Sequence, residues 1–69
     1  MTQNEKILEF MREKGSITPV EAMAEFGCMR LAARISDIRA SGVNVTSTME
    51  RSKNRYGDTV HFARYRLEE

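Results

Sequence analysis

Two groups of basic residues are the part of this sequence whose types and spacing could do chemistry. The first is GCMRLAARISDIRASG, residues 27–42, which contains Arg30, Arg34 and Arg39. The second is RSKNRYGD, residues 51–58, where cations stand at alternate positions: Arg51, Lys53 and Arg55. Such cations bind phosphate, and the arginine fork also matches the two acceptors on the edge of guanine. Nucleic acid is therefore the first ligand class to weigh.

Enzymatic and metal chemistry have little support in the residue types. The chain holds one histidine, His61, and one cysteine, Cys28, far apart in the sequence. A zinc site needs more ligands, and no glycine-rich phosphate loop is present. Cys28 at a helix start could become more acidic through the helix dipole, but it is better explained as a small apolar residue in a turn. We expect no enzyme, no metal and no cofactor, and a structural role for His61.

The composition indicates one small soluble domain. The 69 residues are 41% hydrophobic and 30% charged, which is typical of a folded domain. No apolar run approaches the roughly 20 residues of a membrane span, and no signal-peptide pattern opens the chain. Together with a single cysteine, these features predict a cytoplasmic protein with no membrane partner.

The charge is unevenly distributed along the chain, although the net charge is only +1. Residues 1–27 carry three basic and five acidic side chains, a net −2, whereas residues 28–69 carry eight basic and five acidic, a net +3. Uneven charge of this kind can mark the surface that meets nucleic acid, while +1 overall is weak for that purpose. The basic half begins with the arginine-rich segment.

Helix-start signals precede the arginine-rich segment twice. Thr2 to Glu5 and Thr18 to Glu21 both have the spacing of a capping box, in which each side chain bonds the other residue's backbone N–H. Pro19 suits the first position of the second helix. Gly15 and Gly27 suit the left-handed position that ends a helix. The sequence predicts helices over about 3–14, 19–26 and 29–41.

The third helix follows the second after a very short turn. Only two residues separate it from Gly27, so the two helices should cross at a large angle, as in a helix-turn-helix unit. Leu31, Ile35 and Ile38 recur at spacings of four and three, and we expect them in the core. Most of the methionines, Met49 among them, are also expected in the core.

The periodicity changes to two after the third helix. Alternate residues from Val43 to Met49 are apolar or small, and TVHFARYRL, residues 59–67, alternates again less cleanly. The polar segment between them indicates a turn. We expect a β-hairpin over about 43–67, and either a bulge or a strand with both faces partly covered would explain the mixed alternation of its second strand. Ile17 has room only for a connector or a short edge strand.

This order predicts an α+β fold, a winged helix-turn-helix in a single domain over 1–69: three helices followed by a two-stranded hairpin wing. The stretch ITPVEAMAEFGCMRLAARISDIRASG, followed by KNRYGDTVHFARYRL, also resembles a family of small winged helix-turn-helix proteins of phages and prophages. The resemblance covers almost the whole chain. It implies binding of double-stranded DNA by a transcriptional regulator or an accessory protein in a phage or mobile-element setting.

In a DNA complex, the third helix would read the major groove with its N-terminal part. Arg30 lies there and is the best candidate for a guanine edge, while Ala33 is small enough to permit close approach. Arg39 is expected to reach the DNA backbone or to pair with an acid of its own chain. The candidate contacts on this helix are Met29, Arg30, Ala33, Arg34, Ser36 and Asp37.

Simpler interpretations exist for the same residues. Arginines on helices are often solvated or ion-paired, and Arg34 is well placed to pair with Asp37. The Asp37 carboxylate would repel phosphate unless it accepts from a cytosine amine or orients an arginine. The outward alanines, Ala33 among them, fit a protein surface as well as DNA. The alternative function is therefore a winged-helix module that binds a protein partner without DNA.

The hairpin turn supplies the second set of candidate contacts. Alternate residues of an extended wing share one side, so its cations could line a phosphate backbone or enter a minor groove. Tyr56 is as well suited to packing across the hairpin as to DNA, and the cations could instead protect strand edges. The candidate wing contacts are Arg51, Lys53, Asn54, Arg55 and Tyr56.

Two features of the sequence leave alternatives open. Arg64 and Arg66 recur on one side of the last strand, where they would extend the basic surface or pair with Glu50 or Glu68. A DNA-binding domain of this size contacts few base pairs, so a homodimer on a two-fold symmetric DNA site is an option. No residue identifies a dimer surface.

Overall fold

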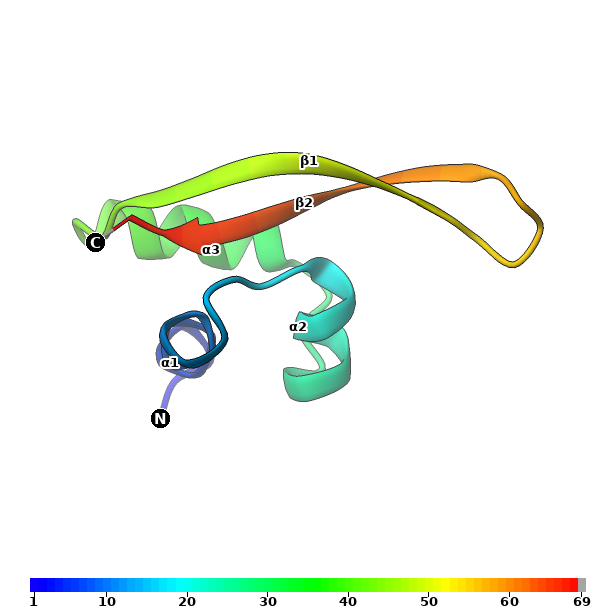
Figure 1. Cartoon of the computed structure of the whole chain (residues 1–69). Coiled ribbons are helices and arrows are strands. Elements are labelled where there is room, and N and C mark those ends of the chain that lie inside the picture. The colour runs from blue at the N-terminus through cyan, green and yellow to red at the C-terminus, as the bar shows by residue number, and fades with distance from the viewer. Residues whose placement is uncertain (69) are drawn as a thin grey trace.

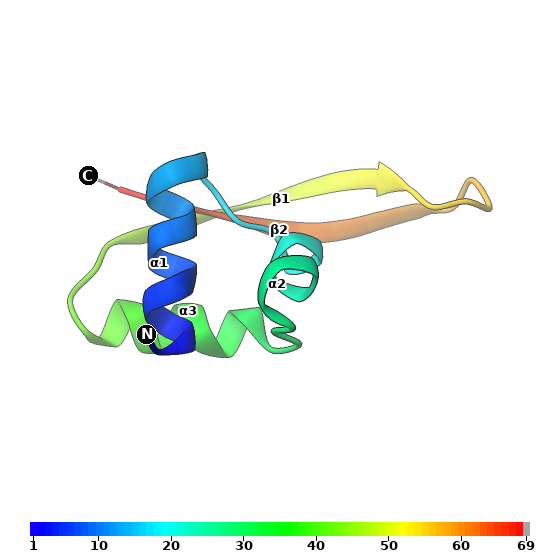
Figure 2. The same cartoon turned by 90° about the horizontal axis from the view of Figure 1, so that it is seen from below.

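The computed structural model describes residues 1–68, which form three helices followed by a two-stranded antiparallel sheet. The elements are α1 (Gln3–Lys14), α2 (Pro19–Phe26), α3 (Leu31–Ala40), β1 (Val45–Lys53) and β2 (Thr59–Leu67). The helices lie on one side of the hairpin, whose turn projects past α2 and beyond the N-terminal end of α3 (Figures 1 and 2). The predicted fold class is confirmed.

Local sequence signals account for the helix ends. Both capping boxes form: the side chains of Thr2 and Thr18 accept from the backbone N–H groups of Glu5 and Glu21, whose carboxylates accept in return. Gly27 follows α2 with φ of 64°, a left-handed conformation that glycine adopts without steric cost. The chain therefore turns sharply from α2 toward α3.

The third helix is shorter than the predicted 29–41. It spans Leu31–Ala40, with Arg30 as its N-cap and Ser41 as its C-cap. Arg30 has non-helical backbone angles of φ −128° and ψ 57°, and its side chain makes no capping hydrogen bond. The first turn is instead held by the Arg30 carbonyl, which accepts from the N–H groups of Ala33 and Arg34.

The hydrophobic core lies between the three helices and the end of the hairpin nearest to them. Leu31, Ile35 and Ile38 are all buried, as their spacing predicts. The hairpin contributes only Val45 and Tyr65 to the buried set. The core consists of Ile7, Met11, Ile17, Ala22, Cys28, Leu31, Ile35, Ile38, Val45 and Tyr65.

The two strands pair without interruption from Val45 opposite Leu67 to Lys53 opposite Thr59. Of the two explanations for the mixed alternation of β2, the bulge is therefore wrong, and consecutive residues from Phe62 to Tyr65 are at least partly buried, as in a strand covered on both faces. The mixed alternation of β2 arises because only part of the hairpin covers the core, so that the residues beyond it need no apolar side. Ile17 forms an isolated bridge to Tyr65 through two hydrogen bonds of 2.9 Å, which reduces the expected edge strand to a single residue pair.

Met49 shows the same effect of hairpin length. Its side chain is 69% exposed, so the expectation of a core methionine is wrong. Met49 lies opposite Ala63, farther along the hairpin than the pair of Ser47 and Tyr65, of which only Tyr65 is buried. Every residue from 51 to 61 is exposed, and we call residues 51–58 the wing tip.

Candidate nucleic-acid interface

The start of α3 presents an unpaired arginine. Arg30 is exposed, and its side chain makes no hydrogen bond or ion pair with any residue in the described part of the chain, 1–68. Its carbonyl is engaged in the first helical turn, which fixes the backbone from which the guanidinium extends. Neighbouring Met29 is 82% exposed. The N-terminal end of α3 therefore offers one cation to an external ligand.

The other two arginines of α3 bond to the chain itself. Arg39 donates from Nε and Nη2 to the backbone carbonyl of Val45, at 3.1 and 3.0 Å. Its partner within the chain is thus a backbone carbonyl and not the expected acid, and contact with the DNA backbone stays a prediction. Arg34 lies 3.7 Å from the Asp37 carboxylate, so these two residues form the ion pair that their spacing predicts.

The remaining candidate residues of α3 are small or acidic. Ser36 and Asp37 are exposed, whereas Ala33 is half-buried and so less outward than the helical period predicts. Asp37, together with Asn4 and Leu8 of α1, lines a shallow groove, which places this flank of α3 beside α1. The open surface of α3 is thus short of side chains that could read a base edge.

The wing tip is a tight polar turn built around Asn54. The Asn54 Oδ1 accepts from the backbone N–H groups of Tyr56 and Asp58, at 2.9 and 3.1 Å. The Gly57 N–H donates to the Asn54 carbonyl at 3.0 Å, and Gly57 takes a φ of 81°. Because its side chain closes the turn, Asn54 has a structural role in addition to any contact with a ligand.

Cations line one face of the hairpin toward its tip. Across the two strands, Arg51 lies opposite His61 and Lys53 lies opposite Thr59, so these four side chains share a face. Residues two apart along a strand share a face. The face that carries Arg51 and Lys53 is therefore the one that, nearer the helices, buries Val45 in the core. Arg55 lies in the turn, outside the pleated strands. Of the three cations predicted to share one side, Arg51 and Lys53 do so within the sheet.

The family model of the winged helix-turn-helix domain matches residues 2–69. The chain belongs to this family. No curated protein and no solved structure matches it. In the winged helix-turn-helix fold, α2 and α3 are the helix-turn-helix, α3 is the recognition helix, and the β1–β2 hairpin is the wing.

The basic side chains of this winged helix-turn-helix divide into two sets. One set bonds within the chain: Arg12, Arg34, Arg39, Arg64 and Arg66. Among residues 1–68 the other set has no hydrogen bond or ion pair: Lys6, Lys14, Arg30, Arg51, Lys53 and Arg55. Four of these six lie at the start of the recognition helix or in the wing tip. The predicted pairing of Arg64 and Arg66 with Glu50 is confirmed.

The wing tip carries an aromatic side chain as well as cations. Tyr56 is 78% exposed, which does not fit packing across the hairpin. Its ring lies 5.9 Å from the Arg55 guanidinium, at the edge of cation–π range. His61 is also exposed, with no hydrogen bond from its side chain within residues 1–68, so the expected structural role is wrong. Sequence reasoning missed His61 as a neighbour of Arg51, because the pairing register was not known.

The helix-turn-helix also carries an apolar groove of about 440 Å³ beside the start of the recognition helix. Three large apolar residues that line it are exposed: Val20 at 75%, Met23 at 44% and Met29 at 82%. Cys28 lies in its floor and is buried, as expected for a small apolar residue in the turn. The lining residues are Pro19, Val20, Met23, Ala24, Cys28, Met29 and Leu31.

Neither a candidate metal site nor a candidate membrane-spanning helix is found among residues 1–68. No group of three or more histidine, cysteine, aspartate or glutamate side chains could hold a metal ion among residues 1–68. None of the helices described there has the length and hydropathy to cross a membrane.

Proposed function

We propose that this winged helix-turn-helix binds double-stranded DNA through the start of α3 and the wing tip. Arg30 would meet a base edge in the major groove, and Arg51, Lys53 and Arg55 would meet the adjacent phosphate backbone or minor groove. The observation that carries the proposal is the division of the cations: four of the six without internal partners lie on these two segments. Phosphate supplies most of the affinity of such proteins, and it requires available cations.

The arrangement also bears on how much base sequence the protein reads. Arg34 and Arg39 are bonded within the chain, which leaves Arg30 as the recognition-helix arginine available for a bidentate contact to guanine. Ser36 and Met29 are further candidates. We therefore propose that most of the affinity comes from the wing and the phosphates, and that direct base reading is confined to a few positions.

The finer role belongs to the same proposal. A small DNA-binding domain with limited base reading suits a transcriptional regulator that binds with a partner or as a homodimer, or an accessory protein that shapes DNA. The resemblance to phage and prophage proteins is what supports a mobile-element setting for either role.

A second candidate function is favoured by the apolar groove at α2 and the start of α3. Exposed Val20 and Met29 beside a groove of about 440 Å³ would suit an apolar protein partner. The groove is close to Arg30, so a protein partner there and DNA would compete for the same end of the recognition helix.

Fluorescence anisotropy with a labelled mixed-sequence duplex at low salt tests the proposal. Wild type should bind, while Arg30→Ala and the double variant Lys53→Ala, Arg55→Ala should bind more weakly. Lys6→Ala, Lys14→Ala is the charge-matched control, because both lysines lie on α1 and lack internal partners. Absence of binding by wild type would overturn the DNA proposal and favour the protein-binding alternative.

A further inference from the structure

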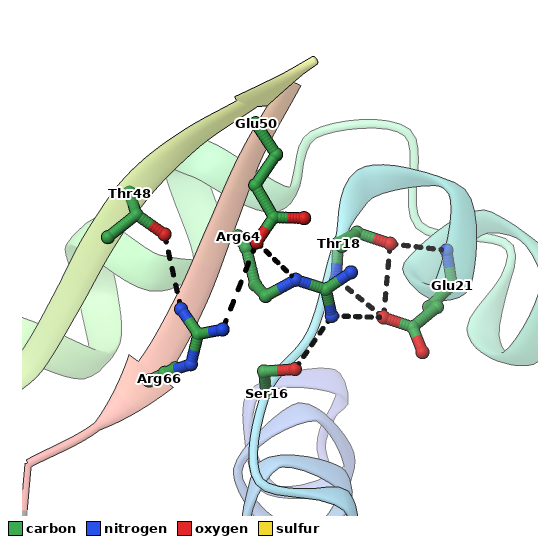
Figure 3. A network of polar contacts seen from close by, with 7 residues as sticks. All are labelled: Ser16, Thr18, Glu21, Thr48, Glu50, Arg64 and Arg66. Carbon is green, nitrogen blue, oxygen red and sulfur yellow. Dashed lines mark hydrogen bonds and ion pairs between the residues drawn. The ribbon is translucent and has the colours of Figure 1, made fainter. Parts of the chain in front are cut away.

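Arg64 joins the hairpin to the α1–α2 connector and the start of α2, in addition to the Ile17–Tyr65 bridge and the Arg39 bond to the Val45 carbonyl. Arg64, on β2, donates from Nη1 to the Ser16 Oγ at 2.8 Å and from Nε to the Glu50 Oε2 at 2.8 Å (Figure 3). The same Nη1 lies 3.9 Å from the Glu21 Oε1. The guanidinium of Arg64 therefore contacts the neighbouring strand β1, the α1–α2 connector and the first turn of α2.

The contact with α2 is made at a point that is itself fixed. The Glu21 Oε1 accepts from the Thr18 backbone N–H and hydroxyl, both at 3.0 Å, as part of the capping box. The carboxylate that faces Arg64 is thus held by the start of α2, and Thr18 is buried. The 3.9 Å ion pair of Arg64 is therefore made with a carboxylate whose position the capping box of α2 fixes.

Apolar packing between α2 and the hairpin is incomplete beyond this point. A groove of about 360 Å³ lies between the start of α2 and the hairpin, lined by Val20, Ser52, Val60 and Phe62 together with Arg64. Val60 is 40% exposed. Close packing does not set the angle of the outer hairpin there, so the polar contacts of Arg64 with Ser16 and Glu21 supply a further restraint on that angle.

Resting on the proposed DNA binding, we propose that Arg64 is a positioning residue that fixes the wing relative to the helix-turn-helix. A fixed wing presents its tip at a constant position relative to Arg30, so both segments engage one duplex together. When two contacts are held at a fixed separation, the second forms at high effective concentration after the first. A loosened wing would lose that advantage while keeping every cation of the wing tip.

Arg66 provides a matched control within the same strand. It donates to the Thr48 hydroxyl at 3.1 Å and lies 3.8 Å from the Glu50 carboxylate. Both partners belong to β1, so Arg66 bonds only within the hairpin (Figure 3). Arg64→Gln and Arg66→Gln remove the same charge from the same strand, but only the first cuts the links to Ser16 and α2.

The experiment has one arm without DNA and one with it. Residual dipolar couplings of the free protein should show a changed or averaged hairpin orientation in Arg64→Gln and the wild-type orientation in Arg66→Gln. In anisotropy, Arg64→Gln should weaken DNA binding by about tenfold or more, through loss of effective concentration. Arg66→Gln should stay near the wild-type affinity.

A double-mutant cycle separates positioning from a direct phosphate contact or a general loss of stability. Arg64→Gln should weaken binding much less in the background of Lys53→Ala, Arg55→Ala than in wild type, because the wing tip then has little to contribute. Equal effects in both backgrounds, or an unchanged hairpin orientation, would overturn the proposal.

Two further outcomes are decided by the same design. If Arg64→Gln does not fold, Ser16→Ala with Glu21→Gln replaces it, since this pair cuts the links to the connector and α2 and leaves the Arg64–Glu50 contact in place. Glutamine at position 21 is still compatible with a capping box. If wild type binds no DNA, the proposed function fails, while the dipolar couplings still show whether Arg64 fixes the wing.

Discussion

The dependence of DNA affinity on salt should follow the number of unpaired cations at the interface. Three of them are assigned to phosphate, Arg51, Lys53 and Arg55, whereas Arg30 is assigned to a base edge. Each phosphate neutralised contributes about −0.9 to the slope of log affinity against log salt, so the wild-type slope should be about −2.7. Removal of the three wing cations by Arg51→Ala, Lys53→Ala, Arg55→Ala should bring the slope close to zero.

These slopes translate into a large difference over an accessible range. Between about 50 and 200 mM salt, wild-type affinity should fall by roughly 40-fold, whereas that of the triple variant should change little. Anisotropy titrations with one labelled duplex at four or five salt concentrations measure both slopes. The two proteins should differ little in stability, because residues 51–58 are exposed and lie outside the core.

The control is the double variant Lys6→Ala, Lys14→Ala. These lysines are also unpaired within residues 1–68, but they lie on α1, at the end of the molecule away from the wing tip (Figures 1 and 2). Their removal should leave the slope unchanged. A triple wing variant with the wild-type slope, or an equal fall in slope for the α1 variant, would refute the assignment of phosphate contacts to the wing.

Three other predictions concern the fold that presents these cations. Arg39→Ala should lower the free energy of unfolding by about 1–3 kcal/mol in urea denaturation, because it removes both donors to the Val45 carbonyl; an unchanged midpoint would contradict this. Gly57→Ala should speed amide hydrogen exchange in the wing tip, since φ of 81° is strained for alanine, while the core amides keep their protection. The pKa of Glu5 lies below its ordinary value because the Thr2 backbone N–H, and then the Thr2 hydroxyl, donate to its carboxylate. This capping contribution to stability is present above the ordinary pKa and declines as pH falls through the lowered one, so NMR titration of Thr2→Ala should show a higher Glu5 pKa than wild type.

The helices were predictable because their signals are local. A threonine and a glutamate three residues apart define the start of α2, and Gly27 defines its end, without reference to the rest of the chain. The hairpin was predictable in type, but its overhang was not. Alternation assigned Met49 to the core, whereas the length of strand beyond the helices depends on where the body of the domain ends.

The sequence predicted which cations belong to the candidate site, but not which of them lack a partner within the chain. A helical period distributes Arg30, Arg34 and Arg39 around α3 and gives no information on which of them bonds internally. Arg39 lies beside the Val45 carbonyl only because the chain reverses after α3. The Arg64 contact with Ser16 joins residues 48 positions apart, for which the sequence carries no signal. Contact of these residues with DNA stays a prediction.

The separation of the wing tip from the core has an evolutionary consequence. Substitutions in most folded segments change stability and function together, and a small domain is close to its stability threshold. Residues 51–58 are exposed and contribute nothing to the buried core, so mutations there leave the fold nearly unchanged. Selection can therefore adjust the strength of binding in small steps through this segment, whereas changes at Arg39 or Arg64 would be filtered first by their effect on the structure.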